Sequence, residues 1–229
     1  MSDTYNVPLK FQFSRPVLKA IFRGIFHLLG RVTITGKEHI PYGTRYVVAM
    51  NHVSIYDPPL IGSFWPEQLE IIGASDVFEK PVQGQVLKAY GVIPVHRGEY
   101  DRALFMKIIK VIQAGYPLLI APEGGRSHVP AMQRAMPGVA YIIEQTRVPV
   151  VPVGLVGTTE DFWQRARRGE RPALEIRIGK PITLSEITAK GAEKHAARQH
   201  NADLVMRHLA GLLPEEYRGV YAESAILPA

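Results

Sequence analysis

The chain has 229 residues, of which 46% are hydrophobic and 21% are charged; this ordinary globular composition suits one domain with appendages and excludes disorder and a polytopic membrane protein. Lys and Arg outnumber Asp and Glu by 27 to 21, so we expect an anionic partner: a phospholipid surface, a phosphorylated metabolite or a nucleic acid. There is no cysteine, which excludes disulfides, thiolate nucleophiles and cysteine-ligated zinc.

The first segment with a clear pattern is RPVLKAIFRGIFHLLGR, at 15–31. Apolar residues recur there at helical spacing, and the basic side chains recur every fourth residue: Arg15, Lys19, Arg23, His27 and Arg31. The pattern predicts an amphipathic helix with a basic stripe. It is too charged to span a bilayer, which takes about 20 apolar residues, but it suits the interface of an anionic membrane. The alternative is a helix that packs on the core of its own domain.

Short apolar runs then alternate with helical patterns. The expected strands lie at 45–50, 70–73, 91–95, 117–121, 148–153 and 174–179, and the expected helices lie around 81–90, 100–114, 134–146 and 192–213. This order predicts an α/β fold, with a central, largely parallel sheet flanked by helices in a single domain, plus the N-terminal amphipathic helix. We expect three parts: a polar tail and interface helix at 1–31, a core at 32–185, and a C-terminal helix and tail at 186–229.

Polar side chains follow three of the expected strands. His52 and Asp57 come after the first strand, Arg97 comes after the third, and Glu123 and Arg126 come after the fourth. Ligands in open α/β sheets bind outside the strand ends. If the strands are parallel, these three groups therefore meet at one rim of the sheet.

The segment NHVSIYD places an imidazole and a carboxylate with four residues between them. Asp57 can reach back to one ring nitrogen of His52, fix its tautomer and leave the other nitrogen free as a base. One alternative is that Asn51 or Asp57 merely caps a helix while His52 is a satisfied core residue. Another is a metal site with His96 and His128 as further ligands, although the tight histidine spacing typical of zinc sites is missing.

The segment LLIAPEGGRSH follows an expected buried strand. Its glycines let backbone N–H groups approach a phosphate or an oxyanion, and Arg126 offers a planar fork for phosphate oxygens. The alternative is a tight turn with a solvated charge pair, and Arg97 has the same two interpretations. No G-x-S-x-G elbow occurs, and we expect Ser54 to bond the backbone, so an acyl-enzyme is not expected.

Four segments, NHVSIYD, GVIPVHR, APEGGRS and VPVVPVGL, occur in the order and approximate spacing of the signature blocks of the glycerolipid acyltransferases, a family that the chain resembles over about residues 33–180. The resemblance implies an α/β acyltransferase core and transfer of a fatty acyl group from acyl-CoA or acyl carrier protein to a hydroxyl of glycerol 3-phosphate or a lysophospholipid. The first expectation for the acceptor is 1-acylglycerol 3-phosphate, which gives phosphatidic acid. Neither a metal nor another cofactor is expected.

The resemblance also implies roles for residues. His52 resembles the family's general base, Asp57 the carboxylate that orients it, and Arg97 the cation that holds the acceptor's phosphate. The third block is the expected acceptor-binding segment, formed by Glu123, Gly124, Gly125, Arg126 and Ser127.

Two residues depart from the family pattern. Ala121 stands where the family usually has an aromatic residue, and Gly125 stands where it usually has threonine. Gly125 removes a hydroxyl donor and loosens the loop, so the identity of the acceptor is in more doubt than the type of reaction.

Acceptors of this kind reside in membranes. We therefore expect a protein on the cytoplasmic face of the membrane, peripheral or monotopic, with the basic stripe of the N-terminal helix against the headgroups. The run WQRARRGERP, which follows Phe162, is expected to form a second contact, or else it is a solvated loop. Acyl carrier protein is a further possible partner, and nucleic acid is not expected.

Two rival functions stay open. One is a thioester or phosphoester hydrolase that uses the same His–Asp pair. The other is a non-catalytic protein that binds anionic lipid or nucleic acid; the basic residues have few interleaved aromatic residues of the kind that stack on bases, which argues against nucleic acid.

Overall fold

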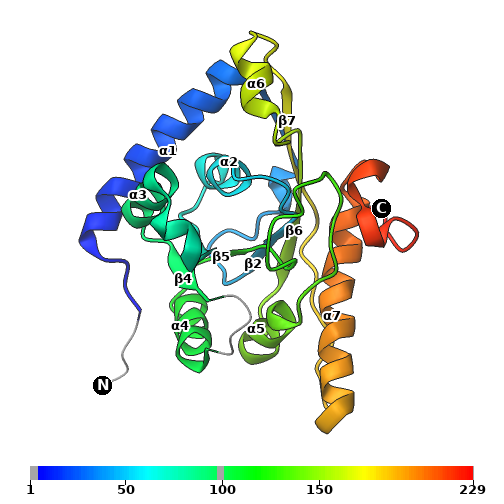
Figure 1. Ribbon diagram of the computed structural model, residues 1–229. Helices are drawn as coiled ribbons and strands as arrows, with labels where there is room; N and C mark the ends of the chain where they lie inside the picture. The colour runs from blue at the N-terminus through cyan, green and yellow to red at the C-terminus, as the bar shows by residue number, and fades with distance from the viewer. Residues whose placement is uncertain (1–4, 97–100, 229) are drawn as a thin grey trace.

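A mostly parallel sheet forms the centre of the molecule (Figure 1). In residues 5–96 and 101–228, which the computed structural model describes, seven strands pair in the order β1-β7-β6-β2-β5-β3-β4. β2 to β6 run parallel to one another, whereas β7 is antiparallel to β6 and carries β1 as a parallel edge strand. The strands are β1 (Arg31–Thr35), β2 (Val47–Met50), β3 (Glu70–Ala74), β4 (Ile93–Val95), β5 (Leu118–Ile120), β6 (Val150–Val156) and β7 (Ala173–Ile178).

The central strands are apolar throughout because both of their faces are covered. In β2, Val47 and Ala49 lie in one hydrophobic core, and Val48 and Met50 lie in the other. Side chains along a strand alternate between the two faces, so a strand inside two layers of helices needs an unbroken apolar sequence. This confirms the predicted α/β fold with a central, largely parallel sheet.

Two layers of helices cover the sheet. Helices α4, α5 and α7 supply Ile108, Val139 and Val205 to one core, and helices α1, α2 and α6 supply residues such as Phe26 and Leu60 to the other. The helices are α1 (Leu9–Leu29), α2 (Asp57–Phe64), α3 (Pro81–Tyr90), α4 (Arg102–Gln113), α5 (Gly138–Thr146), α6 (Phe162–Arg167) and α7 (Gly191–Gly211), with 3-10 turns at η1 (Lys37–His39), η2 (Ser75–Glu79), η3 (Glu215–Tyr217) and η4 (Gly219–Tyr221).

The six expected strands are all present, with ends that differ from the prediction by up to three residues, and the expected helices are present too. Sequence reasoning missed β1 as a strand because its residues RVTIT are only exposed or half-buried, as befits an edge strand. Sequence reasoning also did not predict a separate helix at Phe162–Arg167. This helix has only six residues, and three of its last four are charged or polar.

The predicted N-terminal helix is present as α1, but its basic stripe does not face outward as a whole: Arg15 is buried and Lys19 is half-buried, whereas Arg23 and His27 are exposed. The expectation that the stripe faces headgroups is therefore wrong for Arg15. Arg15 is 2% exposed and donates two hydrogen bonds to the buried carboxylate of Glu70, one of them at 3.0 Å. Lys19 donates to the carbonyl of Trp65, and Arg23 Nε donates to the carbonyl of Ser63 at 3.2 Å.

Lys19 and Arg23 occupy the carboxyl end of α2. The last carbonyls of a helix have no partner within the helix and carry partial negative charge. Basic side chains placed there satisfy the carbonyls and complement the helix dipole. The basic stripe therefore fixes α1 to α2, which begins with Asp57 and ends at Phe64.

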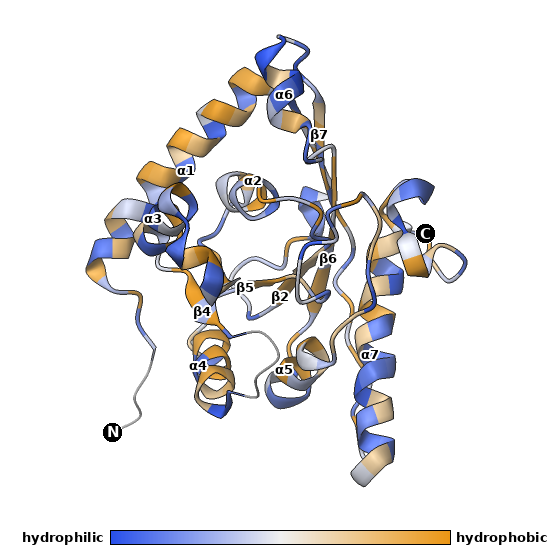
Figure 2. Ribbon diagram, in the orientation of Figure 1, coloured by the Kyte–Doolittle hydropathy of each residue, from blue (hydrophilic) through white to orange (hydrophobic). Residues whose placement is uncertain are grey.

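The opposite side of α1 exposes apolar side chains, and much of this helix is orange in Figure 2. We call this side the outer stripe; its residues, 38–76% exposed, are Leu9, Phe13, Val17, Ile21, Ile25 and Leu28. A continuous exposed apolar face of this kind marks a site of interaction with another apolar surface. In the part of the chain that the structure describes, no helix is both long enough and apolar enough to cross a membrane.

Candidate active site

His52 and Asp57 form a hydrogen-bonded pair at the carboxyl end of β2. His52 Nδ1 lies 2.8 Å from Asp57 Oδ2, and the His52 side chain is 15% exposed while that of Asp57 is fully buried. Because Nδ1 faces a carboxylate, the ring carries its proton on Nδ1, and Nε2 is the nitrogen with a free lone pair. The predicted contact between the two side chains is therefore present.

Asp57 is held by backbone and side-chain donors from two parts of the chain. Its Oδ2 also accepts hydrogen bonds from the N–H groups of Val53 and Ser54, each at 2.8 Å, and its Oδ1 accepts one from the hydroxyl of Thr158. A buried carboxylate needs such donors, because burial without them is costly. The contacts leave the carboxylate one orientation, the one that faces His52.

Sequence reasoning missed Thr158, and it considered Asn51 only as a possible helix cap. The Asn51 amide does not cap a helix: it donates to the carbonyl of Leu155 at 3.0 Å and accepts from the N–H of Leu155 at 2.7 Å. The available signal was that Thr158 follows β6, which is next to β2 in the sheet. The predicted strand stopped at residue 153, and Thr158 was therefore not considered as a rim residue. Ser54 does bond the backbone, as predicted, because its Oγ accepts from the N–H of Tyr56.

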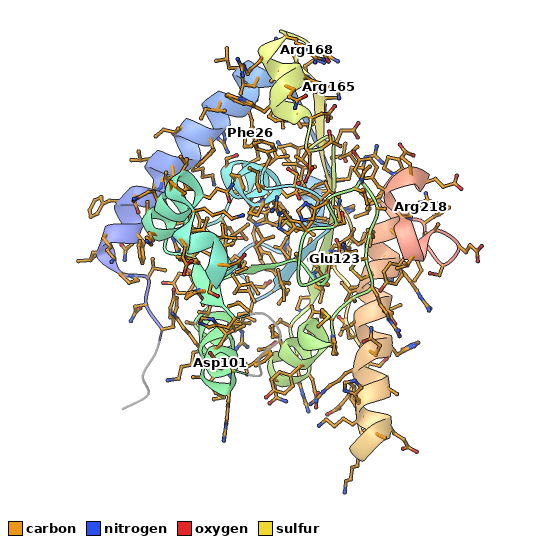
Figure 3. The ribbon with its side chains drawn as sticks, viewed as in Figure 1. Phe26, Asp101, Glu123, Arg165, Arg168 and Arg218 are labelled. Carbon is orange, nitrogen blue, oxygen red and sulfur yellow. The ribbon has the colours of Figure 1, made fainter. Side chains whose placement is uncertain are left out.

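The Glu123 segment lies directly against His52 (Figure 3 labels Glu123). Glu123 Oε1 accepts from the N–H of His52 at 2.9 Å, Glu123 Oε2 accepts from the N–H of Gln133 at 2.8 Å, and the N–H of Ser127 donates to the carbonyl of His52 at 2.9 Å. Both peptide groups of His52 are thus bonded to one segment. The predicted meeting of the first and third blocks at the sheet rim is present in the structure.

Glu123 is buried, with 6% of the residue exposed. Burial raises its pKa to about 7, against the opposing effect of the N–H groups of Gln133 and His52. Burial dominates because the charged form loses its hydration. Glu123 therefore changes its protonation near neutral pH although it lies in the interior.

The loop after Glu123 carries donors without protein partners. Gly124 has φ +72°, and a Cβ there would lie 3.0 Å from Met136 Cγ, so this position favours glycine. In residues 5–96 and 101–228, the N–H groups of Gly125 and Arg126 and the half-buried guanidinium of Arg126 have no partner. Ser127 differs, because its hydroxyl donates to the carbonyl of Val129. Successive free N–H groups of this kind suit an anion.

Other predicted site residues lie elsewhere or outside the described residues. Arg97 falls within 97–100, which the structure does not describe, and its role stays a prediction. His96 Nδ1 contacts Ser75 Oγ at 3.1 Å, and His128 Nδ1 contacts the exposed Glu160 at 2.9 Å. These two histidines, which the metal alternative would bring to His52, contact other residues instead.

A profile of the acyltransferase family matches residues 31–156, more than half of the chain. The chain belongs to the acyltransferase family. The matched range runs from β1 to the end of β6 and includes the His52–Asp57 pair and the Glu123 segment.

Individual members of the acyltransferase family share low identity with the chain. A 1-acyl-sn-glycerol-3-phosphate acyltransferase of Cocos nucifera is 28% identical over 72% of this chain and 54% of its own length. One of Bacillus subtilis is 25% identical over 84% of this chain and 92% of its own length. The chain thus spans about half the length of some curated relatives, such as that of Cocos nucifera, and nearly all of others.

A solved structure has the same fold. The 1-acyl-sn-glycerophosphate acyltransferase PlsC of Thermotoga maritima superposes with a TM-score of 0.61 at 20% identity, over 85% of this chain and 79% of that one. At this identity the likeness concerns the fold, a mostly parallel sheet between helices.

The hydroxyl of Thr158 is expected to stabilise the site. Thr158→Val keeps the shape of the side chain but removes the donor to Asp57, and a buried acceptor that loses its donor costs about 1–3 kcal/mol. We expect the free energy of unfolding, measured in urea, to fall by that amount. Thr158→Ser keeps the hydroxyl and should retain most of the stability; a Thr158→Val variant as stable as the wild type would show that the hydrogen bond does not contribute.

Glu123 is expected to make stability depend on pH. Because the pKa of Glu123 rises from 4.5 to about 7 on folding, the folded protein keeps a proton that the unfolded chain loses. The stability that Glu123 contributes by keeping its proton is fully present below about pH 4.5 and is lost as the pH rises through about 7. Relative to Glu123→Gln, the wild type should lose roughly 2–3 kcal/mol of unfolding free energy between about pH 5 and about pH 8. Parallel pH curves for the two proteins would contradict this assignment.

Proposed function

We propose that this protein is a 1-acylglycerol-3-phosphate O-acyltransferase, which transfers a fatty acyl group from acyl-CoA or acyl carrier protein to the free hydroxyl of 1-acylglycerol 3-phosphate and forms phosphatidic acid. The observation that carries the proposal is the hydrogen bond of 2.8 Å between His52 Nδ1 and Asp57 Oδ2. The backbone of His52 is bonded to the Glu123 loop, whose N–H groups at Gly125 and Arg126 have no partner among the described residues and could bind an anion. The names of the relatives from Cocos nucifera and Bacillus subtilis support this choice of acceptor.

In the proposed reaction His52 is the general base. Its Nε2 accepts the proton of the acceptor hydroxyl as that oxygen attacks the thioester carbonyl, and Asp57 stabilises the imidazolium that forms. The tetrahedral intermediate then collapses, the C–S bond breaks, and the leaving thiolate takes the proton from the imidazolium. A positioned base of this kind contributes about 100 to 10,000-fold to the rate.

The acceptor's phosphate is proposed to bind at the loop after Glu123. The guanidinium of Arg126 and the N–H groups of Gly125 and Arg126 are donors without protein partners in the described chain, and Arg97, which follows β4 in the sequence, is proposed as a second cation. Glu123 joins the loop to His52, because its Oε1 accepts a hydrogen bond from the N–H of His52. Holding the acceptor beside the base lowers the barrier by several kcal/mol.

Membrane association is proposed to depend on the outer stripe of α1, inserted from the cytoplasmic face. Six exposed apolar side chains on one helix face favour a monotopic arrangement. The tip of α6 is proposed as a second contact: Trp163 is 46% exposed, Figure 3 shows Arg165 and Arg168 at this tip, and Arg171 ties the region to the end of α1 by donating to the carbonyl of His27 at 2.7 Å. An indole beside cations suits the headgroup region.

The two rival functions predict different products. A hydrolase would use the free Nε2 of His52 to activate water and would release free fatty acid. A protein that only binds lipid would not need a neutral base at all.

The decisive assay combines acyl-CoA, 1-acylglycerol 3-phosphate and EDTA. We expect phosphatidic acid as the product, and we expect His52→Ala to lower kcat at least about 100-fold because the general base is lost. The matched control is His200→Ala, an exposed histidine on α7, which should keep full activity. Free fatty acid as the sole product would support the hydrolase, and full activity in His52→Ala would exclude the proposed mechanism.

Membrane binding is expected to be mainly hydrophobic because the outer stripe exposes six apolar side chains. The protein should pellet with neutral phosphatidylcholine vesicles and should stay bound at about 1 M salt, where the Debye length is about 3 Å. The double variant Phe13→Asp, Ile21→Asp should lose this binding, whereas Val220→Asp, at another exposed apolar residue, should keep it. Release by salt alone would show that charge drives binding.

A further inference from the structure

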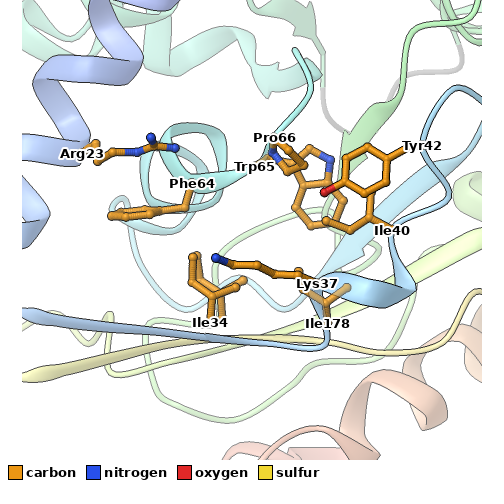
Figure 4. A pocket seen from close by; sticks show the side chains of 10 residues that line it. Arg23, Ile34, Lys37, Ile40, Tyr42, Phe64, Trp65, Pro66 and Ile178 are labelled. Atoms are coloured by element: carbon orange, nitrogen blue, oxygen red, sulfur yellow. The ribbon is translucent and has the colours of Figure 1, made fainter.

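A groove lies at the opposite end of α2 from His52. It is a cavity of about 260 Å³ between α1, the end of α2 and the β1–β7 edge of the sheet (Figure 4). In Figure 4 Ile34 and Ile178 form its floor, and Phe64 and Trp65 lie across from them; Ile176 also lines it. Since α2 has eight residues at 1.5 Å per residue, its two ends are about 10 Å apart. The groove is therefore separate from the candidate active site.

Two cations stand at the rim of this apolar groove. In Figure 4 the Lys37 ammonium lies over the isoleucine floor and the Arg23 guanidinium lies beside the ring of Phe64; both residues line the groove. Arg23 uses Nε for the carbonyl of Ser63 and lies over the ring of Phe64, 5.3 Å from its centre, so its terminal nitrogens stay free of protein partners in the described chain. The lining contains no carboxylate, and no described residue pairs with Lys37.

The groove extends toward the carboxyl end of α1. A second hollow, lined by Val32 and His27, shares Arg23, Ile34, Lys37 and Phe64 with it. An apolar trough with positive charge at its mouth complements a molecule with an acyl chain and an anionic head. A lipid in the leaflet beside α1 has both parts.

We propose that this groove binds an anionic phospholipid, with one acyl chain on the isoleucine floor and the phosphate between Arg23 and Lys37. The ligand is a membrane lipid with a net negative headgroup. It is distinct from the acyl donor and the acceptor, which the His52 region is proposed to bind. The inference goes beyond the proposed reaction and does not depend on it.

Trp65 provides a direct test. The chain has two tryptophans, so in Trp163→Phe the only indole is Trp65, which is 2% exposed and lines the groove. Bromine on an acyl chain quenches indole fluorescence by contact. We expect phosphatidylglycerol with brominated chains, in vesicles that bind the protein, to quench Trp65 more than brominated phosphatidylcholine does at equal amounts of bound protein.

Three further variants, each in the Trp163→Phe background, separate the two halves of the site. Lys37→Glu should weaken the preference for phosphatidylglycerol by about fivefold, since each basic residue near an anionic surface contributes about 1 kcal/mol. Ile34→Phe should fill the groove and reduce quenching by both lipids. The control Lys107→Glu makes the same charge change at an exposed residue of α4 and should behave as the parent.

The outcomes are distinct. Equal quenching by the two brominated lipids would overturn the assignment of an anionic ligand. No quenching of Trp65 in bound protein, or quenching that Ile34→Phe leaves unchanged, would overturn the groove as the binding site. Because the readout is fluorescence, failure of the proposed acyl transfer would leave this result unaffected.

Discussion

The buried carboxylate of Asp57 is the group on which the arrangement of the candidate site depends. It accepts hydrogen bonds from the His52 ring, from two N–H groups of the turn between β2 and α2, and from the hydroxyl of Thr158 after β6. A fully buried charge is tolerated only when such donors are in place. The need to satisfy one carboxylate therefore fixes the ends of two neighbouring strands and the start of a helix, and His52 takes its orientation from them.

The two ends of α2 have complementary electrostatics. Its amino end carries Asp57, where the helix dipole is positive, and its carboxyl end meets Lys19 and Arg23, where the dipole is negative. α1 is thereby joined to the same short helix that begins the candidate site. Since Arg15 and Lys19 are used within the protein, the proposed affinity of α1 for a bilayer depends mainly on its apolar side chains.

Sequence reasoning predicted the features that depend on local pattern. The central strands were found because strands buried on both faces are apolar throughout, and the His52–Asp57 contact was found because five positions on one turn allow it. Asn51 and Thr158 contact partners 104 and 101 residues away in the chain, and no local pattern reports such distances. The orientation of α1 was wrong for a related reason: helical periodicity shows that two faces differ, and it does not show which one is inside.

The anchoring of α1 has a mechanical consequence. Arg15 pairs with Glu70, a fully buried carboxylate of β3, and Phe26 fills part of the core beneath the sheet. A truncation before β1 would leave that carboxylate without its partner and open the core, so α1 is a structural wall of the domain. Any tilt of α1 would be transmitted through Lys19 and Arg23 to α2, whose far end holds the histidine in place.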